Sequence, residues 1–476
     1  MTAAGVLARA GHAVTLFERT ERLGGKAQGF EQEGIKLDSG PTLLTLPRTV
    51  RETFAALAAE DLLPRLFELP EACAYHYPDG ARFIAHRNLD ALAAEARAFG
   101  PREADAMRDF YQKAEEIYAA AGAPYLEAPF ERMTGFMARV AARGLRAIST
   151  GMQLRTLAEL AASHFTSEHL RQYVNRFATY VGASPYQASA AFALIPHLER
   201  AEGVHHPEGG MNALVGAMEA AIRRLGVKVV LSARAELEMR ERHPHVGPRG
   251  DAAPFDAVVV NADPLAFERK YDAPLALSGY VACFELPPGA SLPHHAVLFA
   301  PNYRREFETL FSGKVPEEPT LYLCHPASTD PGMASPDGRS GLFVMANAPP
   351  LPRWKGESEA AELDRARTFW EREGRTLREH VRSRLATSLP ALRGPLRLLR
   401  ERTPVDFLLQ GAPGGSLYGM VPHGKLGPFR RPKIKADVPG VFYAGGGTHP
   451  GGGVPMVMLS GRFAAQLALQ HLGGPA

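Results

Sequence analysis

The sequence predicts an α/β fold, and three segments far apart in the chain predict it. Residues 3–10 have the pattern of a helix and are followed by a short apolar strand over 13–18. A helical pattern over 210–226 precedes the buried strand pattern DAVVV at 256–260. Near the C-terminus, residues 441–462 read as a strand, a glycine-rich loop and the start of a helix. Helices alternating with apolar strands are typical of a parallel sheet covered by helices.

The length of the chain predicts two domains. A chain of 476 residues is longer than a single hydrophobic core usually supports. Segments of the nucleotide-binding type recur at both ends and near residues 205–263, so we expect one discontinuous domain and one inserted α+β domain. The expected nucleotide-binding domain comprises 1–70, 203–265 and 430–476, and the expected substrate and membrane-contact domain comprises 71–202 and 266–429.

The composition excludes several classes of protein. The net charge of +3 is too small to indicate nucleic acid binding. Cys73, Cys283 and Cys324 are far apart and form no Cys-x-x-Cys pair, which argues against a disulfide framework and favours a reducing cytoplasm. No apolar run approaches the length that spans a bilayer, so we expect no transmembrane helix.

The N-terminal residues resemble the second half of a Rossmann-like βαβ unit. Gly11 ends the first helix, and the strand that follows closes on Glu18. An acid at this strand end suits a hydrogen bond to a ribose hydroxyl, although a plain surface acid is the alternative. A complete unit would begin with a strand and a G-x-G-x-x-G turn roughly 20 residues before the acid, and Met1 lies only seventeen residues before Glu18. The first strand and the glycine turn are therefore expected to be missing here, and a true start upstream is preferred to the loss of a central strand.

The intervening segments have a different pattern. Residues 49–63, 87–122 and 357–389 are helical in pattern, and 275–350 is rich in strands such as GYVACFEL and GLFVMANA. Residues 392–440 are expected to be strand and loop. These segments predict the α+β character of the inserted domain.

The C-terminal segment VFYAGGGTHPGGGVPMVMLSGR predicts a close approach between backbone and ligand. Its loop contains six glycines and two prolines between a strand and a helix-like run that begins at Gly461. Glycine has no Cβ, so such a loop can contact a flat or phosphorylated ligand. Paired with the acid at residue 18, the loop predicts a bound flavin dinucleotide and redox chemistry.

Seven short motifs are spread along the chain. They are Glu18 after 13–17, Arg22-Leu23-Gly24-Gly25, Asp38-Ser39-Gly40-Pro41-Thr42, Tyr180–Pro185, Glu208–Met211, Asn261–Pro264 and Gly447–Gly451. Together these motifs resemble the bacterial phytoene desaturase family of carotenoid dehydrogenases, which are flavoproteins related in fold to amine oxidases. The resemblance runs from residue 3 to about residue 470. The tail HPGGGVPMVMLSGR is more similar to the branch that contains hydroxycarotenoid 3,4-desaturases.

The resemblance implies FAD as the cofactor and assigns a set of residues to it. Lys26 stands where many relatives carry arginine, which keeps the charge but loses the bidentate fork. At the adenosine end, the implied contacts are Glu18 at the ribose and Val229 at the adenine. Along the pyrophosphate and ribityl chain they are Arg22, Gly24, Gly25, Lys26, Gly446, Gly447 and Thr448. At the flavin end they are Gly40, Pro41 and Thr42 at the border of the ring, and Gly453, Val454 and Pro455 at the isoalloxazine.

The resemblance also implies an FAD-dependent desaturase that introduces double bonds into a carotenoid. The flavin accepts a hydride, so the protein supplies orientation and a dry pocket, and no catalytic side chain is assigned. The implied partners are an apolar carotenoid, a membrane surface at the cytoplasmic face, and oxygen or quinone as the electron acceptor. Residues 132–158 contain arginines and apolar residues but no acid, which suits contact with anionic head groups; a core-facing helix pair with a solvated basic side is the alternative.

Other functions stay open at this point. A related flavoprotein could act as a hydroxycarotenoid 3,4-desaturase, a carotenoid oxidase, a polyene saturase or an amine oxidase. From another class, the chain could be a truncated, non-catalytic remnant that binds a carotenoid or a partner enzyme. The missing first strand is the observation that favours this last alternative.

Several histidines are candidates for metal ligands or for acid–base groups. Adjacent histidines such as His205-His206 and His294-His295 rarely point at one ion, so we expect no metal. His449 lies in the glycine-rich loop, where fixing the loop is favoured over a direct proton role. Phe192, Ile195, Phe284 and Phe343 would either line a substrate tunnel or fill the core.

Overall fold

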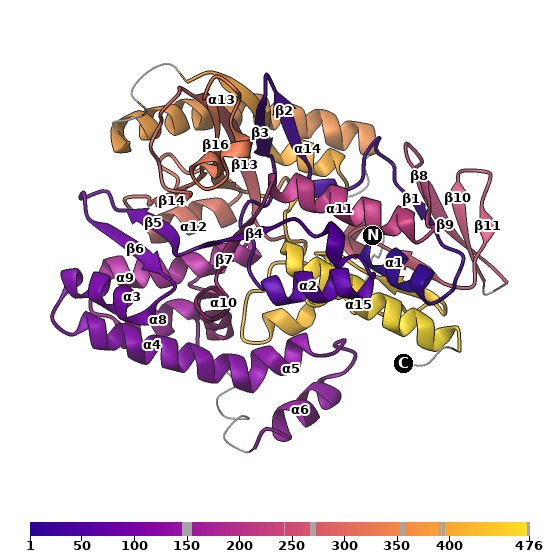
Figure 1. Cartoon of the computed structure of the whole chain (residues 1–476). Coiled ribbons are helices and arrows are strands. Elements are labelled where there is room, and N and C mark those ends of the chain that lie inside the picture. The colour runs from indigo at the N-terminus through magenta and orange to yellow at the C-terminus, as the bar shows by residue number, and fades with distance from the viewer. Residues whose placement is uncertain are drawn as a thin grey trace.

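The computed structural model describes residues 1–144, 155–241, 243–266, 273–352, 358–389, 392 and 396–473. Figure 1 shows a long helix over the sheet at the top of the molecule, a helical layer at the lower left, and small sheets at the right. Both ends of the chain lie on the right of this view, where α1 (Thr2–Arg9) and α15 (Val454–His471) pack together. Among the described residues, no helix has the length and the apolar character that a bilayer crossing requires.

Two parallel strand pairs bring together segments more than 180 residues apart. Strand β1 (Thr15–Phe17) pairs with β8 (Lys228–Val230), and β12 (Val258–Val260) pairs with β18 (Val441–Tyr443). Valine and the other β-branched or aromatic residues of these short strands favour the extended backbone. Helices α1, α15 and α11 (Gly210–Arg224) pack beside these pairs through their alanine, leucine and methionine side chains.

A second, larger sheet has seven strands in the order β17-β13-β16-β15-β14-β5-β6. Its pairs are antiparallel except for β14 with β5. We propose that this sheet marks the inserted domain and that the two parallel pairs mark the nucleotide-binding domain. The strands are β5 (Glu71–His76), β6 (Arg82–His86), β13 (Ser278–Leu286), β14 (His295–Leu298), β15 (Leu321–Cys324), β16 (Ser340–Ala348) and β17 (Leu398–Arg402).

Helices cover the large sheet. The side chains of α13 (Glu359–Ser388), among them Trp370 and Leu377, pack against residues of β13, β15 and β16. A helical layer shares a core with β5 and β6, and aromatic rings such as Tyr75, Phe83 and Tyr173 dominate it. The layer contains α3 (Leu89–Ala96), α4 (Glu103–Ile117), α5 (Ala123–Leu126), α6 (Met133–Ala141), α8 (Leu157–His164), α9 (Glu168–Asn175) and α10 (Leu194–Glu202).

Small hairpins and ribbons complete the described fold. The hairpin β2 (Gly29–Gln32) and β3 (Ile35–Asp38) lies against α11, and β4 (Leu66–Leu69) pairs with β7 (Val204–Pro207). A ribbon at the right of Figure 1 contains β9 (Ala235–Arg240), β10 (His243–Pro248) and β11 (Ala253–Pro254).

The structure differs from the sequence-based elements in four places. The strand-rich part contains α12 (Tyr303–Phe311), and the segment expected to be strand and loop contains α14 (Pro404–Leu409). Helix α2 (Pro47–Ala56) ends earlier than expected. The last helix begins at Val454 rather than Gly461, because a proline in the first turn loses no intrahelical hydrogen bond.

Candidate functional site

A large cavity lies where the helical layer, the seven-stranded sheet and the C-terminal loop meet. It has a volume of about 400 Å³, and most of the side chains around it are apolar. We call it the central cavity. Its walls come from residues 40–46, 121–140, 176–198 and 418–431, from β14, β15 and β16, and from 450–456.

One wall of the central cavity is made of backbone. Gly40, Pro41 and Thr42 line it together with the segment Gly451–Pro455. A Cβ on Gly452 would lie 2.7 Å from the ring of Tyr418, so this position has room only for glycine. The wall therefore lets a flat ring system come close to the main chain.

The N-terminus of α15 lies in the lining of the central cavity. Gly453 is the N-cap and has no side chain to bond the first amides of the helix, and both Val454 and Met456 line the cavity. The first amides of a helix have no intrahelical acceptor, and the helix dipole favours an electron-rich ligand there. This arrangement fits the oxidised ring of a flavin, which carries carbonyl oxygens and ring nitrogens.

Glu18 and Val229 come together at the parallel pair β1–β8, away from the central cavity. The amide of Glu18 donates to the carbonyl of Val230 at 2.9 Å, and Val229 lies opposite Leu16. One carboxylate oxygen of Glu18 accepts from both the amide and the hydroxyl of Thr20, each at 2.8 Å. The carboxylate is thereby held at the strand end, as the ribose assignment requires.

The turn with Arg22, Gly24, Gly25 and Lys26 bridges α11 and the wall of the cavity. Gly24 has a φ of 111°, and its Cβ would lie 2.7 Å from Val215 on α11. The ammonium of Lys26 donates to the carbonyl of Leu417 at 2.7 Å. The carbonyl of Lys26 lies so close to Gly40 that a Cβ there would be 1.8 Å away. The two predicted flavin segments are therefore in direct contact.

Gly446, Gly447 and Thr448 lie behind the cavity rather than in its lining. The Thr448 hydroxyl is buried and donates to the carbonyl of Pro432 at 2.6 Å. The carbonyl of Gly446 accepts from Arg431 at 3.0 Å, and a Cβ on Gly447 would lie 2.6 Å from the carboxyl carbon of Asp263. In the described structure these residues fix the shape of the loop.

His449 is packed among aromatic rings. Its ring centre lies 4.4 Å from that of Tyr125 and 5.8 Å from that of Phe463. Burial lowers the pKa of His449 to about 3, so the imidazole is neutral at physiological pH. This environment favours the loop-fixing role over a direct proton role.

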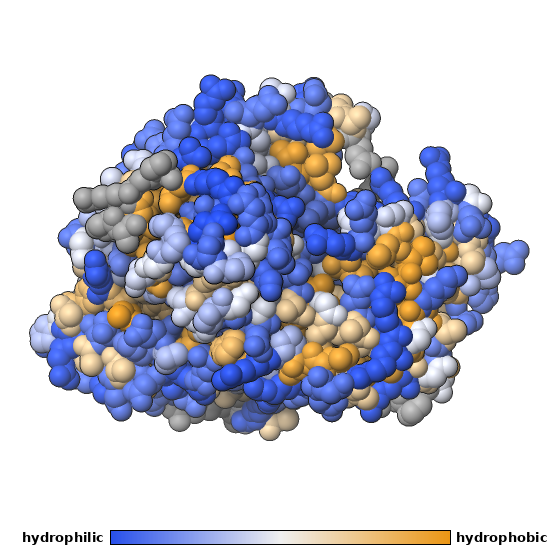
Figure 2. All heavy atoms as spheres, turned by 45° about the horizontal axis from the view of Figure 1, so that its top comes forward, coloured by the Kyte–Doolittle hydropathy of each residue, from blue (hydrophilic) through white to orange (hydrophobic). Residues whose placement is uncertain are grey.

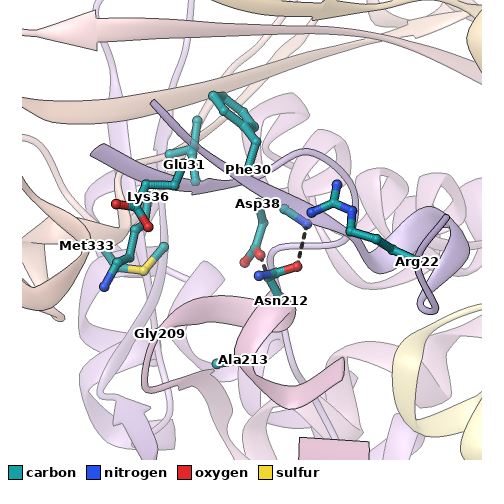
Figure 3. Close-up of a pocket in the computed structure, with 11 residues that line it drawn as sticks. Arg22, Phe30, Glu31, Lys36, Asp38, Gly209, Asn212, Ala213 and Met333 are labelled. Carbon is teal, nitrogen blue, oxygen red and sulfur yellow. Dashed lines mark hydrogen bonds between the residues drawn. The ribbon is translucent and has the colours of Figure 1, made fainter. Parts of the chain in front are cut away.

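A second pocket, of about 410 Å³, lies between the β2–β3 hairpin and α11 (Figure 3). Asp38 accepts from the amides of Met211 at 2.7 Å and Asn212 at 3.0 Å, and Asn212 accepts from the amide of Gly29 at 3.1 Å. Burial raises the pKa of Asp38 to about 7, against the opposing effect of those two amides. Asp38 thus caps α11 and joins it to the hairpin.

Sequence reasoning missed a polar chain that leaves the central cavity. The hydroxyls of Thr42 and Tyr322, both on the cavity wall, are 2.7 Å apart. The Tyr322 hydroxyl is 2.8 Å from Nδ1 of His295. The sequence pattern of residues 321–324 indicates a strand. It does not indicate that this strand, β15, pairs with β14, and that pairing brings the rings of Tyr322 and His295 together.

A buried charge network was also missed. Arg176, on the cavity wall, donates to the hydroxyls of Tyr75 at 3.2 Å and Tyr180 at 3.1 Å. The Tyr180 hydroxyl donates in turn to the carboxylate of Glu199. Burial raises the pKa of Glu199, and the nearby Arg176 and Tyr180 oppose that rise.

The histidine pairs come together more closely than the sequence indicated. Ligand atoms of His294, His295 and Cys324 lie within 4.8 Å of one another, and the rings of His206 and His294 are 4.9 Å apart. His295 and Cys324 are register partners on β14 and β15, which places them on one face. The expectation that adjacent histidines diverge is therefore wrong for His294 and His295, and the absence of a metal stays a prediction.

The chain is similar to flavoenzymes over nearly its whole length. Residues 1–469 match the family described as flavin containing amine oxidoreductase. The chain is 35% identical to a hydroxyneurosporene desaturase of Cereibacter sphaeroides, over 98% of this chain and 94% of the relative. It is 31% identical to a lycopene-forming phytoene desaturase of Paracoccus sp., over 98% and 94%.

Solved structures share the fold. Cyclohexylamine oxidase from Brevibacterium oxydans superposes with a TM-score of 0.60 at 16% identity, over 99% of this chain and 96% of that protein. A triple mutant of putrescine oxidase gives a TM-score of 0.63 at 15% identity, over 99% and 96%. At these identities the similarity establishes the fold alone.

Proposed function

The chain belongs to the flavin containing amine oxidoreductase family, and we propose that, with FAD as its cofactor, it introduces double bonds into a carotenoid. The predicted α/β fold, the FAD-dependent oxidoreductase class and the resemblance to carotenoid desaturases are confirmed by these comparisons. The observation that carries the proposal is the central cavity, which joins an apolar space to a backbone wall of glycine and proline.

We place FAD across the segments that the sequence assigned to it. The flavin end is supported by the apolar lining of the central cavity, which includes Gly40, Pro41, Thr42, Gly453, Val454 and Pro455. The strand end with Glu18 and Val229 supports the adenosine end. The residues proposed between these ends are Arg22, Gly24, Gly25, Lys26, Gly446, Gly447 and Thr448.

FAD supplies the two-electron oxidation, because its ring system accepts a hydride. The residues of this chain hold the polyene and exclude water from it. Side chains such as Phe136, Phe192 and Phe343 give the cavity an apolar lining, which suits a hydrocarbon chain. Phe192, Ile195 and Phe343 line the cavity, whereas Phe284 packs in the core beneath α13. The electron acceptor that follows, oxygen or quinone, stays a prediction.

A hydroxylated carotenoid is the second candidate substrate. Arg176, Tyr180 and Tyr322 add polar atoms to the otherwise mostly apolar wall of the cavity, beside the hydrogen bonds that they make within the protein. A terminal hydroxyl group on the substrate would form a hydrogen bond there, so the protein would favour a hydroxylated carotenoid over a hydrocarbon. Relatives named hydroxyneurosporene desaturase, at 30–35% identity, support this candidate beside the phytoene desaturases.

Feeding experiments test the proposal and separate the two substrates. Cells that carry the gene are supplied with phytoene, neurosporene or a hydroxylated carotenoid, and product spectra are recorded. Each added conjugated double bond moves the absorbance to longer wavelength, so a red shift with one substrate identifies it. The purified protein should also carry the absorbance of bound flavin. Unchanged spectra with all three substrates from a flavin-containing protein would rule out desaturation.

We further propose that the cavity opens toward a membrane surface beside α6. Met133 is 38% exposed and Leu426 is 53% exposed, and both line the central cavity. Phe136 and Val140, expected in the interface, are buried inside the protein, so this part of the expectation is wrong. Leu145, Ile148, Met152 and Leu154 lie outside the described residues. Figure 2 shows a different face, which is largely hydrophilic with separate apolar patches.

Replacing Met133 and Leu426 together with glutamate should weaken binding to vesicles of anionic phospholipid by at least about tenfold. The substitution removes apolar area and adds negative charge at the cavity mouth. Co-sedimentation with vesicles measures the change. Leu237→Glu with Met239→Glu is the matched control, since both side chains are 39% exposed on β9, away from the cavity. Equal binding by both double variants would refute a membrane face at α6.

A further inference from the structure

We propose that Thr42, Tyr322 and His295 form the relay that accepts the proton released by desaturation and carries it out of the central cavity. This inference rests on the proposed function. Removing two hydrogens from adjacent carbons gives a hydride and a proton, and an apolar cavity offers few groups to accept the proton. In the described structure, the hydroxyl groups of Thr42 and Tyr322 and the imidazole of His295 supply such an acceptor at the wall of the central cavity.

The hydrogen bonds of the relay are continuous from the cavity to a buried imidazole. The hydroxyls of Thr42 and Tyr322 are 2.7 Å apart, and that of Tyr322 is 2.8 Å from Nδ1 of His295. Tyr322 lies on β15 opposite Val297, and His295 lies opposite Cys324, so the two side chains share one face of the sheet as diagonal neighbours. The ring centres of Tyr322 and His295 are 5.6 Å apart in a stacked arrangement.

The surroundings of His295 keep its imidazole neutral. Burial holds the pKa of His295 well below its usual range, and the neighbouring His294, Arg176 and His206 lower it further. Cys324 and Tyr322 on β15 are the other titratable groups beside it, and burial raises the pKa of both well above the usual range. The neutral imidazole has a free nitrogen lone pair for the proton, and its low pKa and the nearby guanidinium of Arg176 favour onward transfer.

A route to the surface continues from His295. The rings of His294 and His295 are 4.5 Å apart, and Nε2 of each has no protein hydrogen-bond partner among the described residues. Two buried ring nitrogens on neighbouring imidazoles can be bridged by a water molecule. Nδ1 of His294 lies 2.8 Å from the hydroxyl of Thr329, which is partly exposed. A water between the two Nε2 atoms would complete a route from His295 through His294 to the partly exposed Thr329.

One C–H bond of the substrate breaks with both electrons, and the hydride goes to FAD, which is reduced. The neighbouring C–H bond gives its electron pair to the new C=C bond, and its proton goes to the Thr42 oxygen. The Thr42 proton moves to Tyr322 and the Tyr322 proton moves to Nδ1 of His295. The carotenoid loses two electrons and two hydrogens, and no further reactant is needed.

Tyr322→Phe tests the relay because it removes one hydroxyl group and keeps the ring. The expected result is a flavin reduction rate, measured anaerobically with carotenoid, about a hundredfold below that of the unmodified protein. The unmodified rate should stay flat between about pH 6 and 8, because His295 is neutral throughout that range. The variant's rate should rise with pH, since solvent hydroxide must replace the relay, and the effect of D₂O on its rate should change.

Tyr111→Phe is the matched control. Tyr111 is also buried, its hydroxyl lies 2.6 Å from the hydroxyl of Tyr173, and it does not line the central cavity. This variant should keep the unmodified rate, pH profile and D₂O effect. Flavin content and melting temperature, compared across both variants, separate loss of the relay from loss of structure.

The outcomes distinguish the relay from the proposed function. If carotenoid reduces the flavin of the unmodified protein and Tyr322→Phe behaves like Tyr111→Phe, the relay is wrong and the desaturase function stands. If no carotenoid reduces the flavin of the unmodified protein, both fail. Zinc bound in stoichiometric amount by His294, His295 and Cys324, found by metal analysis, would occupy the route and also overturn the relay.

Discussion

Replacing Arg176 with leucine is expected to lower the free energy of unfolding by about 3–5 kcal/mol. Arg176 is 7% exposed, as is Glu199, and the hydroxyl of Tyr180 links the two side chains. Leucine would leave the carboxylate of Glu199 buried without its compensating charge. Denaturation in urea, followed by circular dichroism, measures the loss.

The pH dependence identifies the cause of that loss. Burial already raises the pKa of Glu199, and removal of Arg176 should raise it further. A raised pKa in the folded state means that stability is retained at low pH and lost as the pH rises through that pKa. The deficit of Arg176→Leu should thus be smallest near about pH 4 and grow toward neutrality.

Two further variants complete this test. Adding Glu199→Gln to Arg176→Leu should restore part of the stability, because the buried charge disappears. Arg304→Leu is the control, since Arg304 is exposed over the ring of Tyr186 and should cost about 1 kcal/mol or less. An Arg176→Leu protein as stable as the Arg304→Leu protein would show that the network does not stabilise the fold.

Gly40→Ala should destabilise the protein by about 3 kcal/mol or more and reduce its flavin content. A Cβ at residue 40 would lie 1.8 Å from the carbonyl oxygen of Lys26, which belongs to the backbone and cannot rotate away. The methyl group must push apart the two segments that border the cavity wall. Urea denaturation measures the stability, and fluorescence of flavin released on unfolding measures the content.

Gly216→Ala is the control for this substitution. Gly216 lies on α11, and a Cβ there would meet nothing within 4 Å. Alanine should be neutral or stabilising by up to about 1 kcal/mol, because it has the higher helix propensity. Equal stability and equal flavin content in both variants would contradict the close contact between Gly40 and Lys26.

The local parts of the site were predictable. The strand that closes on Glu18, the turn with Gly24 and Gly25, and the loop before α15 are each encoded within about ten consecutive residues. Apolar periodicity and glycine or proline at fixed positions are sufficient to recognise such segments. Both Gly40–Thr42 and Gly453–Pro455 line the central cavity, and their assignment to one flavin ring stays a prediction.

The polar groups of the cavity were not predictable in this way. Tyr322 and His295 meet only because β15 pairs with β14, and Arg176 reaches Glu199 only through Tyr180. Each residue alone has an ordinary sequence context. The histidine pair at 294–295 shows the same limit, since its convergence with Cys324 depends on strand register.

The sequence by itself determined the α/β class, the flavin cofactor and the family, because glycine positions, strand-end acids and apolar periodicity act over short stretches of backbone. Only the tertiary structure decided which polar side chains face the cavity and which of them are joined. Those contacts connect residues on different elements, and their energies depend on burial and on the register of strands that pair far apart in the chain.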